Sequence, residues 1–153
     1  MSAPSVGVKY RGPSLRHLVA AICTALAAGC SSPQVELAPA QGLSCVDDSK
    51  PCVDQRMATL RVMMADRDRR WVHEPATPHA YASGVRLFAF KGRKKELTCT
   101  ELAIGKREAD AGPTVLKSQA ANGLTPAQVS RGTMLAGEVS RELSMEMRKR
   151  CRA

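Results

Sequence analysis

Aromatic residues and long apolar runs are scarce in this sequence. Only five of the 153 residues are Phe, Trp or Tyr, about 3%, so strands rich in aromatic side chains are not expected. The hydrophobic fraction is 44% and consists mostly of Ala, Leu, Val and Met, which favours helices. The apolar run Leu18–Ala28 has 11 residues, well short of the ~20 that a membrane-spanning helix needs. The composition predicts one helical domain with short appendages.

Familiar catalytic motifs are missing too. There is no G-x-S-x-G, no S-x-x-K and no H-E-x-x-H, so common hydrolase arrangements have no support. Glu101, Glu108 and Asp110 are candidate paired carboxylates, but acids at helical spacing beside lysine and arginine usually lie on a solvated helix face. We expect a protein that is not an enzyme and carries no cofactor, with an envelope enzyme whose site forms only on folding as the alternative.

The formal net charge is +9, and residues 1–29 hold three of the basic residues and no acidic one, so +6 remains without them. Such a surplus favours anionic lipids or envelope polymers, through contacts that weaken as salt rises. The basic clusters lack interleaved aromatic residues and no recognition helix follows Gly123–Arg131, so no nucleic-acid partner is expected. The candidate basic patch consists of Lys91, Arg93, Lys94, Lys95, Arg148, Lys149, Arg150 and Arg152.

The N-terminal segment has the pattern of a secretory signal. Lys9, Arg11 and Arg16 precede the apolar run, and small residues follow it up to Cys30. A basic region, a short apolar core and small residues at the cleavage point are the three parts of a signal peptide.

The end of this segment, Leu26-Ala-Ala-Gly-Cys30, resembles the lipobox of bacterial lipoproteins. The resemblance implies that Cys30 takes a diacylglyceryl group and begins the mature chain, with Gly29 before the cut. The family's usual leucine three places before the cysteine is Ala27 here, which its looser pattern allows. Ser31 stands where enterobacterial members carry Asp for inner-membrane retention, which implies the outer membrane. The remaining chain resembles at most uncharacterised proteobacterial lipoproteins.

Three other interpretations of the N-terminus stay open. Cleavage after Ala25-Leu26-Ala27 would release a soluble secreted protein, an uncut run would be a short anchor, and a buried helix would belong to a cytosolic protein. Removal of Cys23 and lipidation of Cys30 leave four cysteines, an even number that suits an oxidising compartment. We therefore predict a signal peptide at 1–29, a lipidated flexible tether at 30–44 and a helical, disulfide-stapled domain at 45–153.

Two helices are predicted in the first half of this domain. One spans about 51–66, with Val53, Met57, Leu60 and Met64 as its inward stripe. The other follows Thr77-Pro78, with Tyr81, Val85 and Phe88 on one face and Gly84 allowing close approach. The alternation in Val85–Phe90, followed by Lys91–Lys94, leaves an α+β fold with a short hairpin around 85–98 as the alternative.

Two more helices are predicted in the second half. A capping-box pattern, Thr98-Cys-Thr-Glu101, begins one that Gly112-Pro113 should kink or end. A second capping box, Thr125-Pro-Ala-Gln128, begins the last helix, whose inward stripe is Val129, Ala136, Val139, Leu143 and Met147. The fold class is therefore all-α, a bundle of about four helices.

The layout of these helices predicts the cysteine pairing. If the last two pack antiparallel, Cys99 and Cys151 lie at the same end, which leaves Cys45 to Cys52. Zinc is not expected, because the cysteines lack the close C-x₂-C pairs of zinc sites. His73, Glu74 and His79 form a weak candidate metal group, and polar surface residues are the alternative. The function expected is binding or scaffolding by a lipid-anchored envelope protein, with anionic-ligand binding as an alternative.

Overall fold

The computed structural model describes residues 41–118 and 121–151, and all regular structure within these ranges is helical. Four of the α-helices have seven or more residues, so the predicted all-α fold of about four helices is confirmed. No helix in these ranges is both long enough and apolar enough to cross a membrane. The elements are α2 (Gln41–Ser44), α3 (Lys50–Ala65), η1 (Arg70–His73, a 3₁₀ helix), α4 (Pro78–Ser83), α5 (Val85–Arg93), α6 (Cys99–Lys117) and α7 (Pro126–Arg150).

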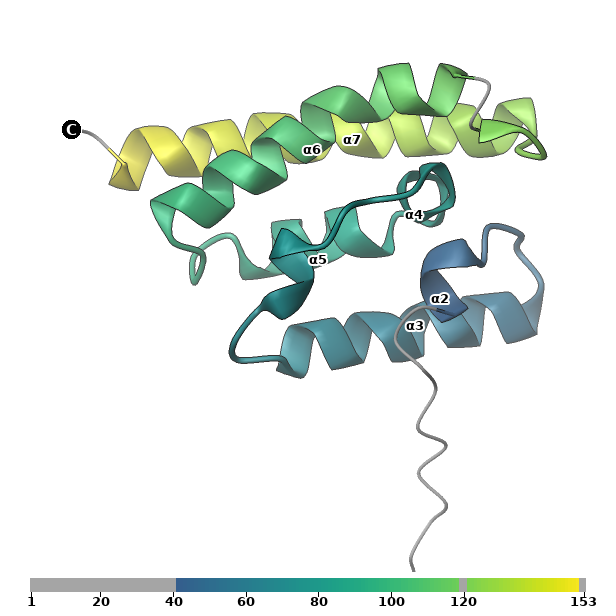
Figure 1. The fold of residues 1–153 in the computed structure, drawn as a ribbon, viewed down its shortest axis with the longest axis horizontal. Coiled ribbons are helices and arrows are strands. Elements are labelled where there is room, and N and C mark those ends of the chain that lie inside the picture. Colours follow the sequence, from purple (N-terminus) through teal and green to yellow (C-terminus); the bar gives the residue numbers. More distant parts are fainter. Residues whose placement is uncertain (1–40, 119–120, 152–153) are drawn as a thin grey trace, which may run out of the picture. The chain divides into compact units, whose positions relative to one another are not determined.

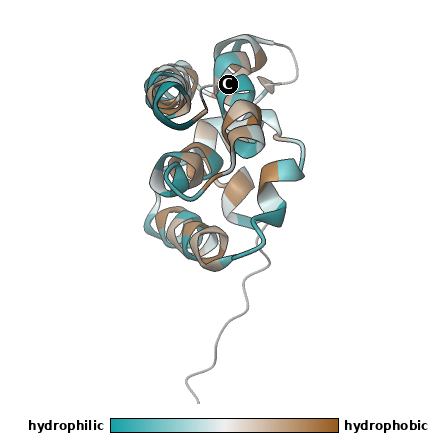
Figure 2. Cartoon of the chain, turned by 90° about the vertical axis from the view of Figure 1, so that its left-hand side faces the viewer, coloured by the Kyte–Doolittle hydropathy of each residue, from teal (hydrophilic) through white to brown (hydrophobic). Residues whose placement is uncertain are grey.

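The helices of this domain are arranged in three levels (Figure 1). The antiparallel helices α6 and α7 pack along each other on one side, α3 and α2 lie on the opposite side, and α4 and α5 lie between them. Figure 2 shows hydrophobic and hydrophilic residues along the same helices, as expected for amphipathic helices that bury one face.

Both predicted capping boxes are present. The Thr98 N–H donates to Glu101 Oε2 at 2.7 Å, and the Glu101 N–H donates to the Thr98 hydroxyl at 3.2 Å. Thr125 and Gln128 make the same reciprocal pair at the start of α7. Each box satisfies two backbone donors that have no partner within the helix, which explains why α6 and α7 begin where the sequence predicts.

The hairpin alternative for residues 85–98 is wrong, because Val85–Arg93 is helical. The helix predicted after Thr77-Pro78 is instead divided at Gly84, whose φ of +75° lies in the left-handed region that favours glycine. A Cβ at Gly84 would lie 2.7 Å from Leu135 Cδ2, so the predicted close approach is confirmed. The break changes the direction of the chain between α4 and α5, and both helices contact α7.

Pro113 does not end α6, which continues to Lys117. Proline costs about 3 kcal/mol inside a helix, but the turn after it buries Leu116, which is 2% exposed. Burying a leucine stabilises by about 1.5–3 kcal/mol. Just before the proline, Gly112 lets α6 approach α7, where a Cβ would lie 2.8 Å from Ala136 Cβ. Packing on α7 therefore offsets the local cost.

Residues 41–44, which the sequence analysis assigns to the tether, form α2 and belong to the folded domain. Gly42 is buried against α3, where a Cβ would lie 2.3 Å from Thr59 Oγ1 and 2.5 Å from the Gln55 carbonyl oxygen. Glycine therefore lets α2 pack directly on α3, a contact that its short, proline-flanked sequence does not reveal.

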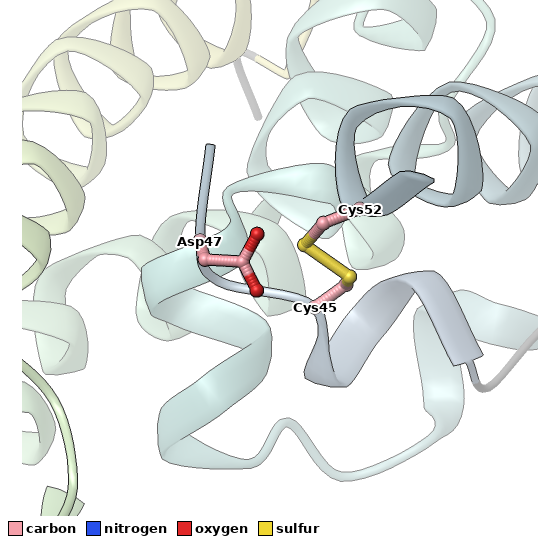
Figure 3. A group of neighbouring side chains, drawn as sticks. All are labelled: Cys45, Asp47 and Cys52. Carbon is pink, nitrogen blue, oxygen red and sulfur yellow. A yellow bond between two sulfur atoms is a disulfide. The ribbon is translucent and has the colours of Figure 1, made fainter. Parts of the chain in front are cut away.

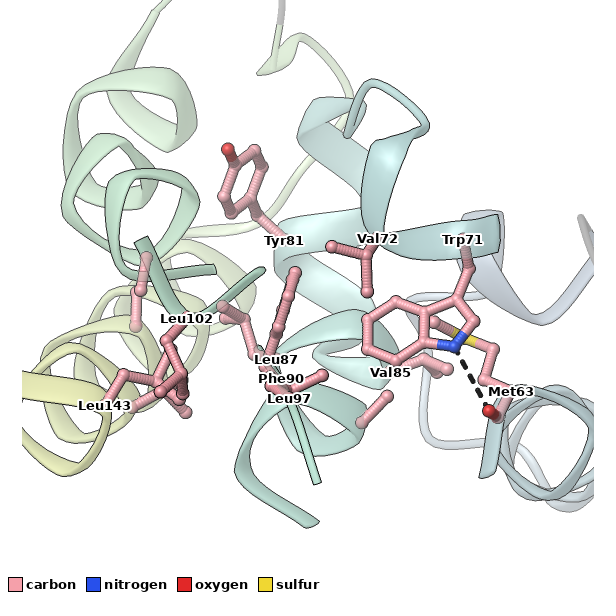
Figure 4. Packing of buried hydrophobic residues seen from close by; sticks show 14 of the residues in the cluster. Met63, Trp71, Val72, Tyr81, Val85, Leu87, Phe90, Leu97, Leu102 and Leu143 are labelled. Carbon is pink, nitrogen blue, oxygen red and sulfur yellow. Dashed lines mark hydrogen bonds between the residues drawn. The ribbon is translucent and has the colours of Figure 1, made fainter. Parts of the chain in front are cut away.

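The core lies around α5 (Figure 4). Trp71 meets Phe90 edge to face with ring centroids 4.8 Å apart, and its Nε1–H donates to the Met63 carbonyl oxygen at 3.1 Å. This bond satisfies the one polar atom of a buried indole. The fully buried side chains around these rings are Leu87, Leu97, Leu102, Val139 and Leu143.

Candidate functional site

Of the apolar stripe predicted for the first helix, only Leu60 packs against the core, and the other three residues stay outside it. Val53 is 37% exposed, Met57 46% and Met64 38%. The buried face of α3 holds Cys52, Thr59 and Met63 instead. Because α2 and α5 pack on that face, the predicted stripe is rotated toward the edge of the domain, where it forms one wall of a groove.

This groove is a pocket of about 220 Å³ between α3, α5 and the first turns of α7. Its apolar lining comes from α3 and α5, and its polar lining includes Arg56, Arg131 and Asp48. The apolar lining residues are Val53, Met57, Leu60, Val85 and Phe88.

Phe88 is the groove's aromatic residue and is 48% exposed, whereas Phe90 on the same helix is completely buried. The two rings point to different faces of α5 because residues two apart on a helix are about 200° apart. Its spacing predicted Phe88 on the face of Tyr81 and Val85, but only those two residues are buried.

Two methionines outside the pocket are also exposed. Met64 lies against Gly92, where a Cβ would be 3.0 Å from Met64 Cε. Met134, three residues after Arg131 on α7, is 67% exposed. Unbranched, polarizable methionine side chains adapt to different partner shapes and are common on binding surfaces.

One end of the groove is charged. Arg131 Nη1 donates to both oxygens of Asp48, at 2.9 and 3.1 Å, and Arg56 Nη2 lies 3.4 Å from Asp48 Oδ1. The hydrogen bond and positive charge of Arg131 hold the pKa of Asp48 below its ordinary value, with Arg56 adding to the effect. Asp48 therefore stays ionised and links α3 to α7 at this end.

The loop that carries Asp48 is closed by the Cys45–Cys52 disulfide (Figure 3). The Val46 carbonyl oxygen accepts hydrogen bonds from Gln128 Nε2 at 3.0 Å and from Arg131 Nη2 at 3.1 Å. The disulfide and these bonds fix the loop against the beginning of α7, so the charged end of the groove has a defined position.

Both predicted disulfides are confirmed, with Cα–Cα distances of 5.4 Å for Cys45–Cys52 and 5.7 Å for Cys99–Cys151. Cys45, Asp47 and Cys52 are the only three possible metal ligands that the described residues bring within 4.8 Å of one another. The two sulfurs are bonded to each other, and Asp47 accepts from the Ser49 N–H at 2.8 Å. The weak candidate group of His73, Glu74 and His79 is not brought together.

Much of the candidate basic patch contacts the protein itself. Lys91 pairs with Glu138 at 2.5 Å and with Glu142 at 3.2 Å, and Lys94 also pairs with Glu142. These pairs connect α5 to α7. They raise the pKa of Lys91 and lower that of Glu142, in each case mainly through hydrogen bonds.

Two of the four arginines of the patch, Arg93 and Arg150, also bind backbone oxygens. Arg93 donates to the carbonyl oxygens of Met64 and Asp66, and Arg150 donates to those of Lys94, Lys95 and Leu97. Lys95, Arg148 and Lys149 are exposed. Arg152, like the predicted lipidation site Cys30, lies outside the described residues. Several residues of the patch therefore join helices of the domain, whereas the sequence predicted a surface for anionic partners.

Two of the three candidate carboxylates are bound by arginines, and the third, Asp110, pairs with Lys106 at 2.5 Å. Glu101 accepts from Arg69 Nε at 2.9 Å, and Glu108 accepts from Arg86 through both oxygens, at 2.9 and 2.6 Å. The sequence analysis assigns Glu108 to a solvated helix face, but its side chain is only 9% exposed. Glu108 is therefore held in an internal ion pair.

A second hollow, of about 340 Å³, borders this ion pair and is lined in part by His73, Tyr81 and Arg107. Burial raises the pKa of Tyr81, the negative charge of Glu108 adds to the effect, and Arg86 opposes it. Both Glu108 oxygens accept hydrogen bonds from Arg86, so this carboxylate is not available as an acid or base. We therefore prefer binding in the groove to catalysis in this hollow.

No protein-family model matches the chain, and no significant similarity to a curated protein or to a solved structure was found.

Proposed function

We propose that this chain is an exported, lipid-anchored protein of the bacterial cell envelope, and that its groove binds an amphipathic helix of another envelope polypeptide. The signal-like N-terminus and the lipobox-like sequence ending at Cys30 support the location, with the outer membrane facing the periplasm as the favoured side. The two disulfides support it as well, because they persist in oxidising compartments.

The observation that carries the binding proposal is the half exposure of Val53, Met57 and Phe88 around one pocket. Contiguous exposed apolar surface rimmed by polar residues is typical of interaction sites. Covering it gains roughly 25 cal/mol for each Å² of apolar area. Binding of a partner that buries these side chains is therefore favourable.

The dimensions of the groove favour a helical polypeptide. A pocket of about 220 Å³ is smaller than the roughly 300–1,000 Å³ of pockets that enclose small molecules. The apolar residues of α3 extend from Val53 to Met64, over three helical turns. An amphipathic helix lies in such a groove with its apolar face down, anchored at several successive turns.

Photo-crosslinking in intact cells tests the binding proposal. A photoreactive residue at position 88 should form adducts with one polypeptide, mapped to an amphipathic helical segment, while the same residue at exposed Thr114 on α6 should not. Met57→Lys should abolish the adduct, because it places a charge in the apolar wall. Equal adducts from both positions, or none from position 88, would overturn the proposal.

Metabolic labelling with a fatty-acid analogue tests the anchor separately. The wild-type chain should carry the label and fractionate with membranes, and Cys30→Ala should do neither. A labelled Cys30→Ala variant would show that the lipobox interpretation is wrong, whatever the groove binds.

A further inference from the structure

Among the charged side chains that line the groove, two are positive and one is negative, and Asp47, outside the lining, also interacts electrostatically with Arg56. Arg56 on α3 and Arg131 on α7 both reach Asp48, so two guanidinium groups share one carboxylate. Arg131 donates hydrogen bonds to both oxygens of that carboxylate. The carboxylate that lines the groove is therefore occupied mainly by Arg131, and Arg56 is the less fully paired of the two guanidinium groups.

Arg56 has unused hydrogen-bond donors. Its side chain is only 16% exposed and lines the groove, yet within the described residues it donates one hydrogen bond, at 3.4 Å. Arg86 and Arg93, which are also largely buried, donate four each. A guanidinium has five N–H donors and pairs best with a carboxylate through two of them. Arg56 can accept such a partner while keeping its contact with Asp48.

We propose that the segment bound in the groove carries an Asp or Glu side chain that pairs with Arg56. This inference rests on the proposed function and specifies the partner's chemistry. The carboxylate lies at the Asp48 end, and the apolar face of the segment covers Met57 and Phe88. A carboxylate at one end of an apolar helix fixes the helix's direction in the groove, because the reverse orientation covers Arg56 without supplying a partner for its unused donors.

Two model peptides provide the test. Both are fluorescein-labelled amphipathic helices of roughly 15 residues, or about 22 Å, a length that matches α3. They share one leucine-rich face and differ only in carrying Asp or Asn at one end. Binding is measured by fluorescence anisotropy with the full chain in lipid nanodiscs, and circular dichroism confirms that each variant is folded.

The acidic peptide should bind wild type about tenfold more tightly than the Asn peptide, as expected for one charge-assisted pair in a partly exposed site. Arg56→Gln should remove this difference. Arg61→Gln is the matched control, because Arg61 is another arginine on α3 and is exposed. That variant should keep the tenfold preference.

The outcomes separate this inference from the proposed function. Equal binding of both peptides to wild type, with Met57→Lys weakening both, would overturn the Arg56 pairing and leave the groove proposal standing. If neither peptide binds to the wild-type protein, both proposals are overturned. Displacement of the acidic peptide by laurate alone, and not by an unlabelled acidic peptide, would assign the site to an acyl chain and overturn the choice of a polypeptide.

Discussion

Arg86 and Glu108 form a buried ion pair in which Nε lies 2.9 Å from Oε1 and Nη2 lies 2.6 Å from Oε2. The same guanidinium donates to the carbonyl oxygens of Trp71 and Glu74, at 2.6 and 2.9 Å. One side chain on α5 thus binds both α6 and the η1 segment. All of its charge is compensated inside the protein, which is the condition under which a buried arginine is tolerated.

Removing the acidic partner should be costly. Glu108→Gln leaves Arg86 buried without its counter-charge, so we expect the free energy of unfolding to fall by about 3 kcal/mol. Glu138→Gln is the control, because its side chain is 47% exposed and exposed pairs contribute about 1 kcal/mol or less. Urea unfolding followed by circular dichroism measures both. Equal losses would contradict the structural role assigned to Glu108.

Two helical glycines should respond oppositely to alanine. A Cβ at Gly105 would lie 2.5 Å from Cδ1 of the fully buried Phe90 ring. We expect Gly105→Ala to destabilise by about 1–3 kcal/mol despite its better helix propensity. At Gly137 the nearest atom is the flexible Arg141 Nη1, 3.7 Å away. Gly137→Ala should therefore stabilise by up to about 1 kcal/mol, and thermal unfolding of the two variants should show opposite shifts in Tm.

The two disulfides should contribute unequally. Cys99 and Cys151 are 52 residues apart, whereas Cys45 and Cys52 are 7 apart. On the loop-entropy model, replacing both cysteines of the long bridge with alanine costs about 4 kcal/mol, and the same change in the short bridge costs about 2.5 kcal/mol. Chemical denaturation of the two double variants tests the order. A larger loss from the short bridge would contradict the entropic explanation.

Acid should destabilise the domain through Glu101. Burial opposes the ionised form of this residue, but hydrogen bonds from Arg69 and Thr98 outweigh it and hold the pKa below its ordinary value. As pH falls, the unfolded chain therefore takes up this proton before the folded chain does, so stability present at neutral pH is lost below about pH 5. Glu101→Gln should reduce this loss, measured as the free energy of unfolding from pH 7 to pH 3. An unchanged pH dependence would contradict the assignment.

The sequence predicts the helix beginnings well because their signals are local. A capping box joins residues three apart, so Thr98 with Glu101 and Thr125 with Gln128 are recognisable without any tertiary contact. The antiparallel pairing of the helices that follow then places Cys99 beside Cys151. These features needed only the order of elements along the chain.

The groove was not predicted, although its apolar residues were singled out. Periodicity shows that Val53, Met57, Leu60 and Met64 share a face of α3, but not whether another helix covers that face. Which face of α3 is covered depends on two glycines. Gly42 lets α2 pack closely against Thr59, and the break at Gly84 sets the direction of α5. The signal for an open face was indirect: Cys52, Thr59 and Met63 form a second row of residues at helical spacing beside the first.

The helical fold class, the capped starts of α6 and α7 and the disulfide pairing follow from the sequence, because each depends on bonds between near neighbours or on element order. The burial of Glu108, the pairing of Lys91 and Lys94 with α7, and the exposure of Phe88 to a groove follow from contacts between distant segments. Whether a side chain is buried or exposed depends on which distant segment packs over it, and the free energy of that packing is shared among residues far apart in the chain.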